Sequence, residues 1–353
     1  MSAVLEALRA AWSGADPGPT VPEHRPPAHR SWPGELLPLP RWPDDGVGGL
    51  LDLALAADPV RKLGGVRLRR VPSAGGRYPI DAHVVIDGVA WSYDPLAHAL
   101  AAPREVGGTG TAIVLSVVPS RTTWRYGPRS LPVLLLDLGH ALAGFAGAEM
   151  VVGGVAPRLG WPGRATEYPL AMITPAAGVH CGAPPAPEPD ATVPVLPLIE
   201  NALAELAELP PTPVPRTTPP VPGQVLARHS APWPLSGRLT SAVAEEVLAA
   251  ADGVGALLVE PAEHPELAEA LSVRSCGQPE VAESGALLLV PGEVEPTPQQ
   301  ALRRHVLAGM AVHRAWLRAT GLGLRCRPVG CWTDAVLDLG ERHRLVHALA
   351  ISA

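Results

Sequence analysis

A short run of small residues in the first third of the chain could hold a ligand. The run consists of Pro72, Ser73, Ala74, Gly75 and Gly76. Small residues leave backbone N–H groups exposed, and the serine adds a hydroxyl donor. Arg69 and Arg70 come just before the run, so a ligand rich in acceptor atoms would meet both N–H groups and cations. An alternating strand is expected from Ile80 to Ile86, and a hairpin loop with solvated arginines is the alternative interpretation.

Cysteines and histidines do not form a metal-binding pattern in the sequence. The four cysteines are Cys181, Cys276, Cys326 and Cys331. Only the last two lie close together, and they lack a second pair with zinc-ligand spacing. The sequence therefore predicts buried free thiols and no metal site. His140 and His305 are expected to be core or interface histidines that neighbouring groups satisfy.

The bulk properties exclude several classes of protein. A net charge of −6 gives no electrostatic reason to expect a nucleic-acid partner. No run of about 18 uncharged apolar residues indicates a membrane span. The first twelve residues contain Glu6 and Arg9 and lack the pattern of a secretory signal, so a cytoplasmic location is predicted. There is no Walker loop, and no GxGxxG motif follows a strand candidate.

Chain length and proline usage indicate two units joined by a connector. At 353 residues the chain exceeds the size at which one hydrophobic core stops growing. Prolines concentrate in an extended arm, Pro17–Pro43, and between Pro184 and Pro222, where Leu196–Leu209 has helical spacing. The predicted boundaries are 1–48 for the arm, 49–183 for the first half, 184–223 for the connector and 224–353 for the second half.

The two units repeat the same order of elements. Strand and helix are expected at Thr111–Val118 and Val133–Met150 in the first half, and at Gly285–Val290 and Pro298–Thr320 in the second. Both helices contain a His-x-Leu-Ala-Gly-x-Ala segment, and a turn that contains glycine follows each. Alanine and glycine at such positions permit close helix–helix approach. The sequence thus predicts an α+β fold made of two related halves packed as an intrachain pseudodimer.

Several ordered motifs resemble those of SagB-type dehydrogenases, a branch of the nitroreductase superfamily. The motifs are PSAGGRYPID, SYDPLAHAL and WRYGPRSLPVLLLDLGHAL. They span roughly Leu50 to Ile173, and the second half resembles the general nitroreductase pattern more weakly. The resemblance implies a duplicated nitroreductase-like fold and the cofactor flavin mononucleotide (FMN). It also implies oxidation of azolines to thiazoles or oxazoles in ribosomally made peptides, as in antibiotic biosynthesis.

The resemblance also implies one composite flavin site. In the superfamily an Arg-x-Ser step holds the flavin phosphate and ribityl chain, and Arg228, His229 and Ser230 match it. A Pro-x-Gly turn lies along the flavin ring, and Pro328, Val329 and Gly330 match it. The loop that starts at Pro72 would reach in from the first half, with Arg70 beside it. Since neither half has both parts, one FMN per chain is expected.

Catalytic residues are implied by the start of the third motif, Trp124–Gly127. SagB-type enzymes carry Lys-Tyr at the corresponding place, and here Arg125 and Tyr126 stand there. Arginine stays protonated and is a poor base. Tyr126 could act as the base if an adjacent cation lowered its pKa. A surface loop with an aromatic anchor is the alternative interpretation.

Two other functions fit the same sequence. One is NAD(P)H-dependent reduction of a nitro compound, quinone or dehydroalanine. The other is a flavin-free scaffold in a peptide-modification complex, which the missing motifs of each half would suit. A peptide or small molecule is the expected substrate and a cyclodehydratase is a candidate partner. The protein is expected to be a monomeric pseudodimer or a homo-oligomer.

Overall fold

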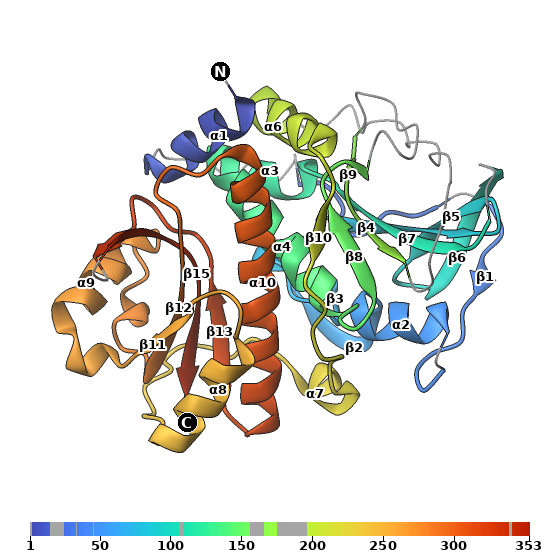
Figure 1. Cartoon of the computed structure of the whole chain (residues 1–353). Helices are drawn as coiled ribbons and strands as arrows, with labels where there is room; N and C mark the ends of the chain where they lie inside the picture. The colour runs from blue at the N-terminus through green and yellow to red at the C-terminus, as the bar shows by residue number, and fades with distance from the viewer. Residues whose placement is uncertain are drawn as a thin grey trace.

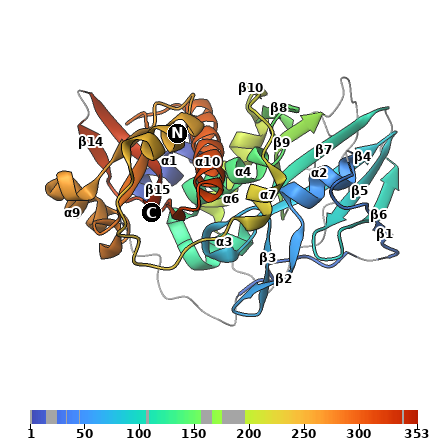
Figure 2. The same ribbon diagram turned by 90° about the horizontal axis from the view of Figure 1, so that it is seen from below.

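The computed structural model shows two antiparallel sheets on either side of a central pair of helices (Figures 1 and 2). The described residues are 2–14, 25–32, 34–44, 46–105, 109–155, 166–174, 196–338 and 341–353. The central helices are α4 (Ser130–Ala143) from the first half and α10 (Pro298–Gly321) from the second. The mixed α+β architecture predicted from the sequence is confirmed.

The first sheet contains eight strands within the described residues, in the order β1-β6-β5-β4-β7-β9-β8-β10. Their bounds are Leu37–Pro38 (β1), Ile80–Ile86 (β4), Val89–Asp94 (β5), Ala99–Glu105 (β6), Thr111–Val117 (β7), Glu149–Val152 (β8), Tyr168–Thr174 (β9) and Thr212–Val214 (β10). The predicted strands at Ile80 and Thr111 pair with each other at the middle of the sheet. Both are buried along almost their whole length: α4 packs against them, and Arg30 and Trp32 of the arm contact Asp81 and His83 of β4. A separate hairpin, β2 (Ala57–Leu63) with β3 (Val66–Arg69), leads into the glycine-containing loop.

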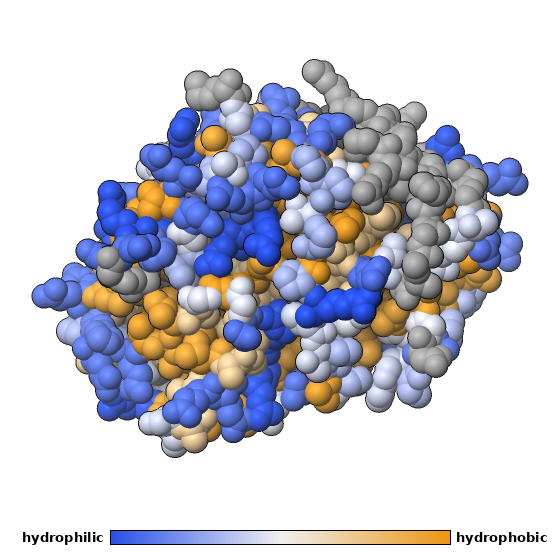
Figure 3. All heavy atoms as spheres, viewed as in Figure 1, coloured by the Kyte–Doolittle hydropathy of each residue, from blue (hydrophilic) through white to orange (hydrophobic). Residues whose placement is uncertain are grey.

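The second sheet has the order β11-β12-β15-β13, and β14 pairs with β15. The bounds are Leu257–Val259 (β11), Ala286–Gly292 (β12), Arg325–Val329 (β13), Val336–Asp338 (β14) and Arg342–Ser352 (β15). Side chains of β12 alternate between the two faces. Leu288 and Val290 pack with α8 (Ser241–Ala250) and α10, whereas Leu287 and Leu289 pack with Trp332 on the other face. Figure 3 shows apolar side chains gathered over β11 and β12, where Leu257 is exposed.

The two halves meet where α4 crosses α10. A Cβ on Gly139 would lie 2.2 Å from the carbonyl oxygen of Val306, and one on Gly309 would lie 2.4 Å from that of Leu136. Each helix therefore presents a glycine to the backbone of the other. The sequence repeat aligned Gly144 with Gly309, but Gly144 packs against Ala54 instead. The prediction of a close, glycine-mediated approach was right, and the glycine predicted for α4 was wrong.

Two predicted elements differ in the structure. The helix expected at Val133–Met150 ends at Ala143, and Glu149 and Met150 belong to β8. Gly147 has a positive φ of 96° between the two, which a helix cannot accommodate. The predicted 1–48 arm begins with a helix, α1 (Ala3–Trp12), which was not anticipated. Residues 15–24 lie outside the described part of the chain.

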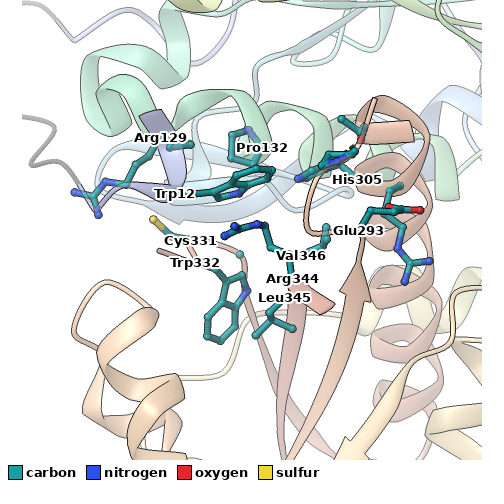
Figure 4. Close-up of a pocket in the computed structure, with 15 residues that line it drawn as sticks. Trp12, Arg129, Pro132, Glu293, His305, Cys331, Trp332, Arg344, Leu345 and Val346 are labelled. Atoms are coloured by element: carbon teal, nitrogen blue, oxygen red, sulfur yellow. Dashed lines mark hydrogen bonds between the residues drawn. The ribbon is translucent and has the colours of Figure 1, made fainter. Parts of the chain in front are cut away.

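The start of the chain and the connector pack together. The predicted helix at Leu196–Leu209 is α6 (Pro197–Glu208), and it lies beside α1 (Figure 1). Glu205 accepts hydrogen bonds from the Ser2 hydroxyl and the Val4 N–H at 2.7 and 3.2 Å. The far end of α1 reaches the second half, where the Arg344 guanidinium lies 3.9 Å above the Trp12 ring (Figure 4). The arm and the connector therefore pack against each other and contact both halves.

The remaining helices are short. They are α2 (Val47–Ala54), α3 (Ser120–Tyr126), α7 (Pro222–Ala227), α9 (Pro265–Arg274) and the 3₁₀ turns η2 (Ala74–Gly76), η3 (Gly127–Arg129), η4 (Pro261–Glu263) and η5 (Pro279–Val281). Among the described helices, none combines the length and the apolar composition that a membrane span requires.

Candidate functional site

A cavity of about 230 Å³ lies at the junction of the two halves, and we name it the seam cavity. The first half contributes Pro72, Ser73, Ala74, Gly75, Tyr126, Val133, Leu136, Asp137 and His140. The second half contributes Ser230, Gln278, Arg327, Pro328, Val329, Gly330, Cys331 and His347. Segments far apart in the sequence thus share one cavity. The glycine-containing loop, one residue of the Arg-x-Ser step and the Pro-x-Gly turn are brought together as predicted.

Hydrogen bonds hold the first-half loop in place. The Ser73 hydroxyl accepts the Tyr78 N–H at 2.8 Å, and the Asp137 carboxylate accepts the Ala74 N–H at 3.0 Å. Gly75 has a φ of 60°, a conformation that favours glycine, and a Cβ there would lie 3.3 Å from the Tyr126 hydroxyl. The loop therefore forms a cavity wall made largely of backbone. Gly76 belongs to the same turn but is not among the lining residues.

The facing wall is the end of β13. Pairing with β15 places Val329 opposite Ala348, and the Val329 carbonyl oxygen lies 3.1 Å from His347 Nδ1. Gly330 follows, and a Cβ on it would lie 3.1 Å from Leu136 and 3.2 Å from the His347 ring. The Pro328–Gly330 turn therefore packs closely against Leu136 and His347, and all of these residues line the cavity.

A buried acid, Asp137, faces the cavity; it lies within the motif that begins at Trp124, but no role was predicted for it. Asp137 is 4% exposed and lies on α4 amid apolar neighbours. Burial raises the pKa of its carboxyl to about 8, although the Ala74 N–H opposes the rise. A carboxyl with this pKa can both accept and release a proton near neutral pH. A single acidic residue within the apolar run Leu131–Leu138 was the signal that could have revealed it.

Tyr126 lies in the cavity as expected, but not as a base. Burial is the main cause that raises the pKa of its hydroxyl, followed by the charge on Asp137. Arg125 lowers that pKa, but less than these groups raise it. Arg125 itself is exposed and is not among the residues that line the cavity. The proposed tyrosinate was therefore wrong, and Tyr126 is a protonated hydrogen-bond donor.

A buried ion pair fixes the helix that carries this tyrosine. Arg121 on α3 donates to both carboxylate oxygens of Asp81 on β4, at 2.6 and 2.9 Å, and to the carbonyl of Tyr78. Paired, hydrogen-bonded charges can persist in such an interior. The anchor ties α3 to the sheet and so sets the position of Tyr126.

The Arg-x-Ser step divides between two environments. Ser230 lines the cavity, whereas His229 is exposed with its Nδ1 3.1 Å from the Ala227 carbonyl. Arg228 is buried behind the wall, 4.3 Å from the Trp316 ring, and donates to the Arg70 carbonyl at 2.7 Å. Arg70 also lies outside the lining and pairs with Asp58 at 3.0 Å. Arg228 thus joins the two halves, the Arg70 side chain pairs within the first half, and neither lines the cavity.

Arg327 is the cation that lines the cavity within the described residues. It immediately precedes Pro328 and stacks at 5.6 Å from the Trp233 ring. Arg327 was not predicted from the sequence because the Arg-x-Ser resemblance pointed elsewhere. Its position one residue before the Pro-x-Gly turn was the available signal.

Three buried histidines connect the cavity wall to the core. His140 Nε2 lies 3.0 Å from His347 Nε2, and His140 Nδ1 lies 3.4 Å from His313 Nδ1. When His347 donates its Nδ1–H to Val329, its Nε2 can accept from His140 Nε2–H, and His140 Nδ1 can accept from His313 Nδ1–H, so three neutral rings satisfy all of these contacts. Burial lowers the pKa of all three, to about 4 for His347 and about 3 for His313. The expectation of satisfied core histidines holds for His140 and for His305, whose Nδ1 lies 2.7 Å from the Ala301 carbonyl.

These histidines should make the fold sensitive to acid. Their pKa values are lowered on folding, so their contribution is complete above pH 6.5 and is lost as the pH falls towards 4 and then 3. A tenfold difference in proton affinity between the folded and unfolded states corresponds to about 1.4 kcal/mol. The raised pKa of Asp137 has the opposite effect, since it favours the folded state at lower pH. It is a single group, however, whereas three histidines have lowered pKa values. Urea unfolding should show lower stability at pH 5 than at pH 7. His313→Leu should reduce the difference in stability between pH 5 and pH 7. His229→Gln, a substitution at an exposed site, should leave that difference unchanged. Equal stability of the unmodified chain at both pH values would contradict the assignment of acid sensitivity to the buried histidines.

The cysteines depart from the predicted buried thiols. Cys326 is buried, but Cys276 is exposed and Cys331 is half-buried, with their sulfurs 2.8 Å apart. Cys181 lies outside the described residues. No group of three or more side chains in the described part of the chain could hold a metal ion.

Comparison with known proteins relates the fold to solved structures. No protein-family model and no curated protein matches the sequence. A candidate nitroreductase from Anabaena variabilis superposes with a TM-score of 0.74 at 15% identity, over 100% of this chain and 99% of that one. NfrA1 nitroreductase from B. subtilis (TM-score 0.30, 15% identity) covers 37% of this chain and 64% of its own. NADPH:FMN oxidoreductase from Vibrio harveyi, complexed with NAD+, has a TM-score of 0.31 and 15% identity. The match covers 37% of this chain and 66% of that one. The chain thus has a nitroreductase-like fold along its whole length.

Proposed function

We propose that the protein is an FMN-dependent oxidoreductase that binds one flavin in the seam cavity. The observation that carries the proposal is that the Pro72–Gly75 loop, the Pro-x-Gly turn and Ser230 line one cavity, together with a buried acid whose pKa lies near neutrality. The whole-chain nitroreductase-like fold supports it. The resemblance of the first half to SagB-type dehydrogenases supports a peptide-borne thiazoline or oxazoline as the substrate.

The residues present fit FMN. The loop that contains Gly75 and the turn that contains Gly330 both line the cavity, so a flat ring system can contact backbone atoms of each segment. Arg327 offers a guanidinium for a phosphate, and Ser230 and Gln278 offer hydrogen bonds to a ribityl chain or ring edge. When bound, FMN supplies the two-electron acceptor for the reaction.

Side chains of the protein would accept the proton that the substrate loses. Azoline oxidation removes a hydride from one ring carbon and a proton from its neighbour. Asp137, when ionised, is the group in the cavity that can take that proton. Tyr126 stays protonated and can donate a hydrogen bond to the substrate. The apolar side chains of Val133 and Leu136 help to keep water from the reacting atoms.

Flavin stoichiometry tests the proposal. Purified full-length protein, stripped of flavin and titrated with FMN, should bind one equivalent per chain, followed by flavin fluorescence. The loaded protein should convert a synthetic thiazoline-containing peptide to the thiazole, with the loss of two hydrogens measured by mass spectrometry. Protein that cannot be loaded would instead support the scaffold. Oxidation of NADPH with a nitro or quinone acceptor, without azoline turnover, would support the reductase.

Arg327→Gln should weaken FMN binding by about 10- to 100-fold, because it removes a charged hydrogen-bond donor to the phosphate. Arg325→Gln is the matched control, since Arg325 lies on the same strand but is exposed and outside the cavity lining. The readout is the FMN dissociation constant. Riboflavin, which lacks the phosphate, should bind both variants equally. If both variants bound FMN as the unmodified chain does, the phosphate would lie elsewhere.

A further inference from the structure

Two cysteines that the proposed oxidoreductase chemistry does not use lie together at the rim of the seam cavity. Cys276 follows α9 and precedes the cavity residue Gln278, and Cys331 follows Gly330 on the opposite wall. Their sulfurs are 2.8 Å apart. The backbone holds the two segments together, because the Thr333 N–H donates to the Arg274 carbonyl at 2.8 Å. A small side-chain movement would bring the sulfurs to bonding distance.

The surroundings distinguish the two thiols. The Arg129 guanidinium lies 2.9 Å from the Cys276 sulfur, and Figure 4 shows the Arg129 side chain and the Cys331 sulfur on the same side of the small pocket next to the seam cavity. The hydrogen bond from Cys331, then Arg129, lowers the pKa of Cys276 to about 6. The same contact and burial raise the pKa of Cys331. Cys276 is therefore the more exposed thiol and has a cation beside it, which favours its ionisation over that of Cys331.

We propose that Cys276 and Cys331 form a reversible dithiol–disulfide pair that reacts with low-molecular-weight disulfides. The Cys276 thiolate attacks one sulfur of the small disulfide, forms a mixed disulfide and releases one thiolate. Cys331 then loses its proton and attacks the Cys276 sulfur, which releases the second thiolate and closes the intramolecular bond. In total, two protein thiols are oxidised, and one small disulfide is reduced to two thiols. The disulfide would link the segment that contains Gln278 to the segment that contains Gly330. Because both residues line the seam cavity, the oxidation state of the two cysteines would affect the shape of the cavity.

Oxidised glutathione is a suitable probe for the full-length protein. Intact mass should fall by two hydrogens, and peptide mapping should show a Cys276–Cys331 link. Cys331→Ser should instead accumulate a glutathione adduct on Cys276, since the second step is blocked. Cys276→Ser should react at least about tenfold more slowly. Arg129→Gln should also slow the reaction, and Cys326→Ser, at a buried thiol, is the control that should leave it unchanged.

Three outcomes would contradict the proposal that Cys276 and Cys331 form a dithiol–disulfide pair. They are the absence of a link in the unmodified chain, an adduct on Cys331 in preference to Cys276, and equal reactivity of the two serine variants. The mass readout needs no flavin and is made both without FMN and with it. Its failure therefore leaves the flavin proposal standing, and failure of FMN binding leaves the cysteine chemistry measurable.

Discussion

Gly139→Ala is expected to lower the free energy of unfolding by about 1 to 3 kcal/mol. The added methyl carbon would lie 2.2 Å from the Val306 carbonyl oxygen, and a backbone atom cannot move aside as a flexible side chain can. Alanine is worth up to about 1 kcal/mol more than glycine in a helix interior. A net loss would therefore show that the clash outweighs this gain. Urea denaturation measures the change.

Gly223→Ala is the matched control for this substitution. It also lies in a helix, α7, but a Cβ there would meet no atom within 4 Å. It should be neutral or slightly stabilising. Gly309→Ala should be as damaging as Gly139→Ala, and the double variant should lose less than the sum because both affect one contact. Unchanged stability in Gly139→Ala would mean that the halves do not meet through these glycines.

Asp137→Asn should lower kcat for a thiazoline peptide by about 10²- to 10⁴-fold, the range that general acid–base catalysis contributes. The amide oxygen can still accept the Ala74 N–H, so the loop should stay in place and FMN binding should be retained. In the unmodified chain kcat should rise with pH through about 8, because the ionised carboxylate is the base. The asparagine variant should lose that rise.

Asp137→Ala separates the proton chemistry from the support of the loop. It removes the acceptor for Ala74 as well as the carboxylate, so FMN affinity should fall together with kcat. Tyr126→Phe should reduce turnover less than Asp137→Asn, since a protonated tyrosine only donates a hydrogen bond. Full turnover in Asp137→Asn would assign the proton to another group.

Much of the fold could be predicted because its signals are local. The alternation in Ile80–Ile86, the apolar run at Thr111 and the helical spacing from Pro298 each lie within a few turns of chain. The helix expected to run to Met150 shows the limit. Local hydrophobicity continues past Ala143, but the chain turns there to supply strand β8.

The candidate site could be predicted only in part, for a similar reason. The residue types of the Pro72 loop and the Pro328 turn suit a ligand wherever they lie, so the sequence could identify them. The Arg-x-Ser step looked equally suitable. Whether Arg228 or Arg327 faces the cavity depends on how Trp316 and the Arg70 carbonyl are placed around Arg228. No spacing in the sequence encodes that choice.

The sequence by itself thus determined the order of strands and helices, the pseudodimeric plan and two of the ligand-facing backbone segments. Tertiary structure alone decided that Asp137 rather than Tyr126 has a pKa near neutrality, and that Cys276 meets Cys331. The physical reason is that backbone propensity and apolar periodicity act between near neighbours in the chain. Desolvation, by contrast, depends on every group that packs around a side chain, and most of those groups come from distant parts of the sequence.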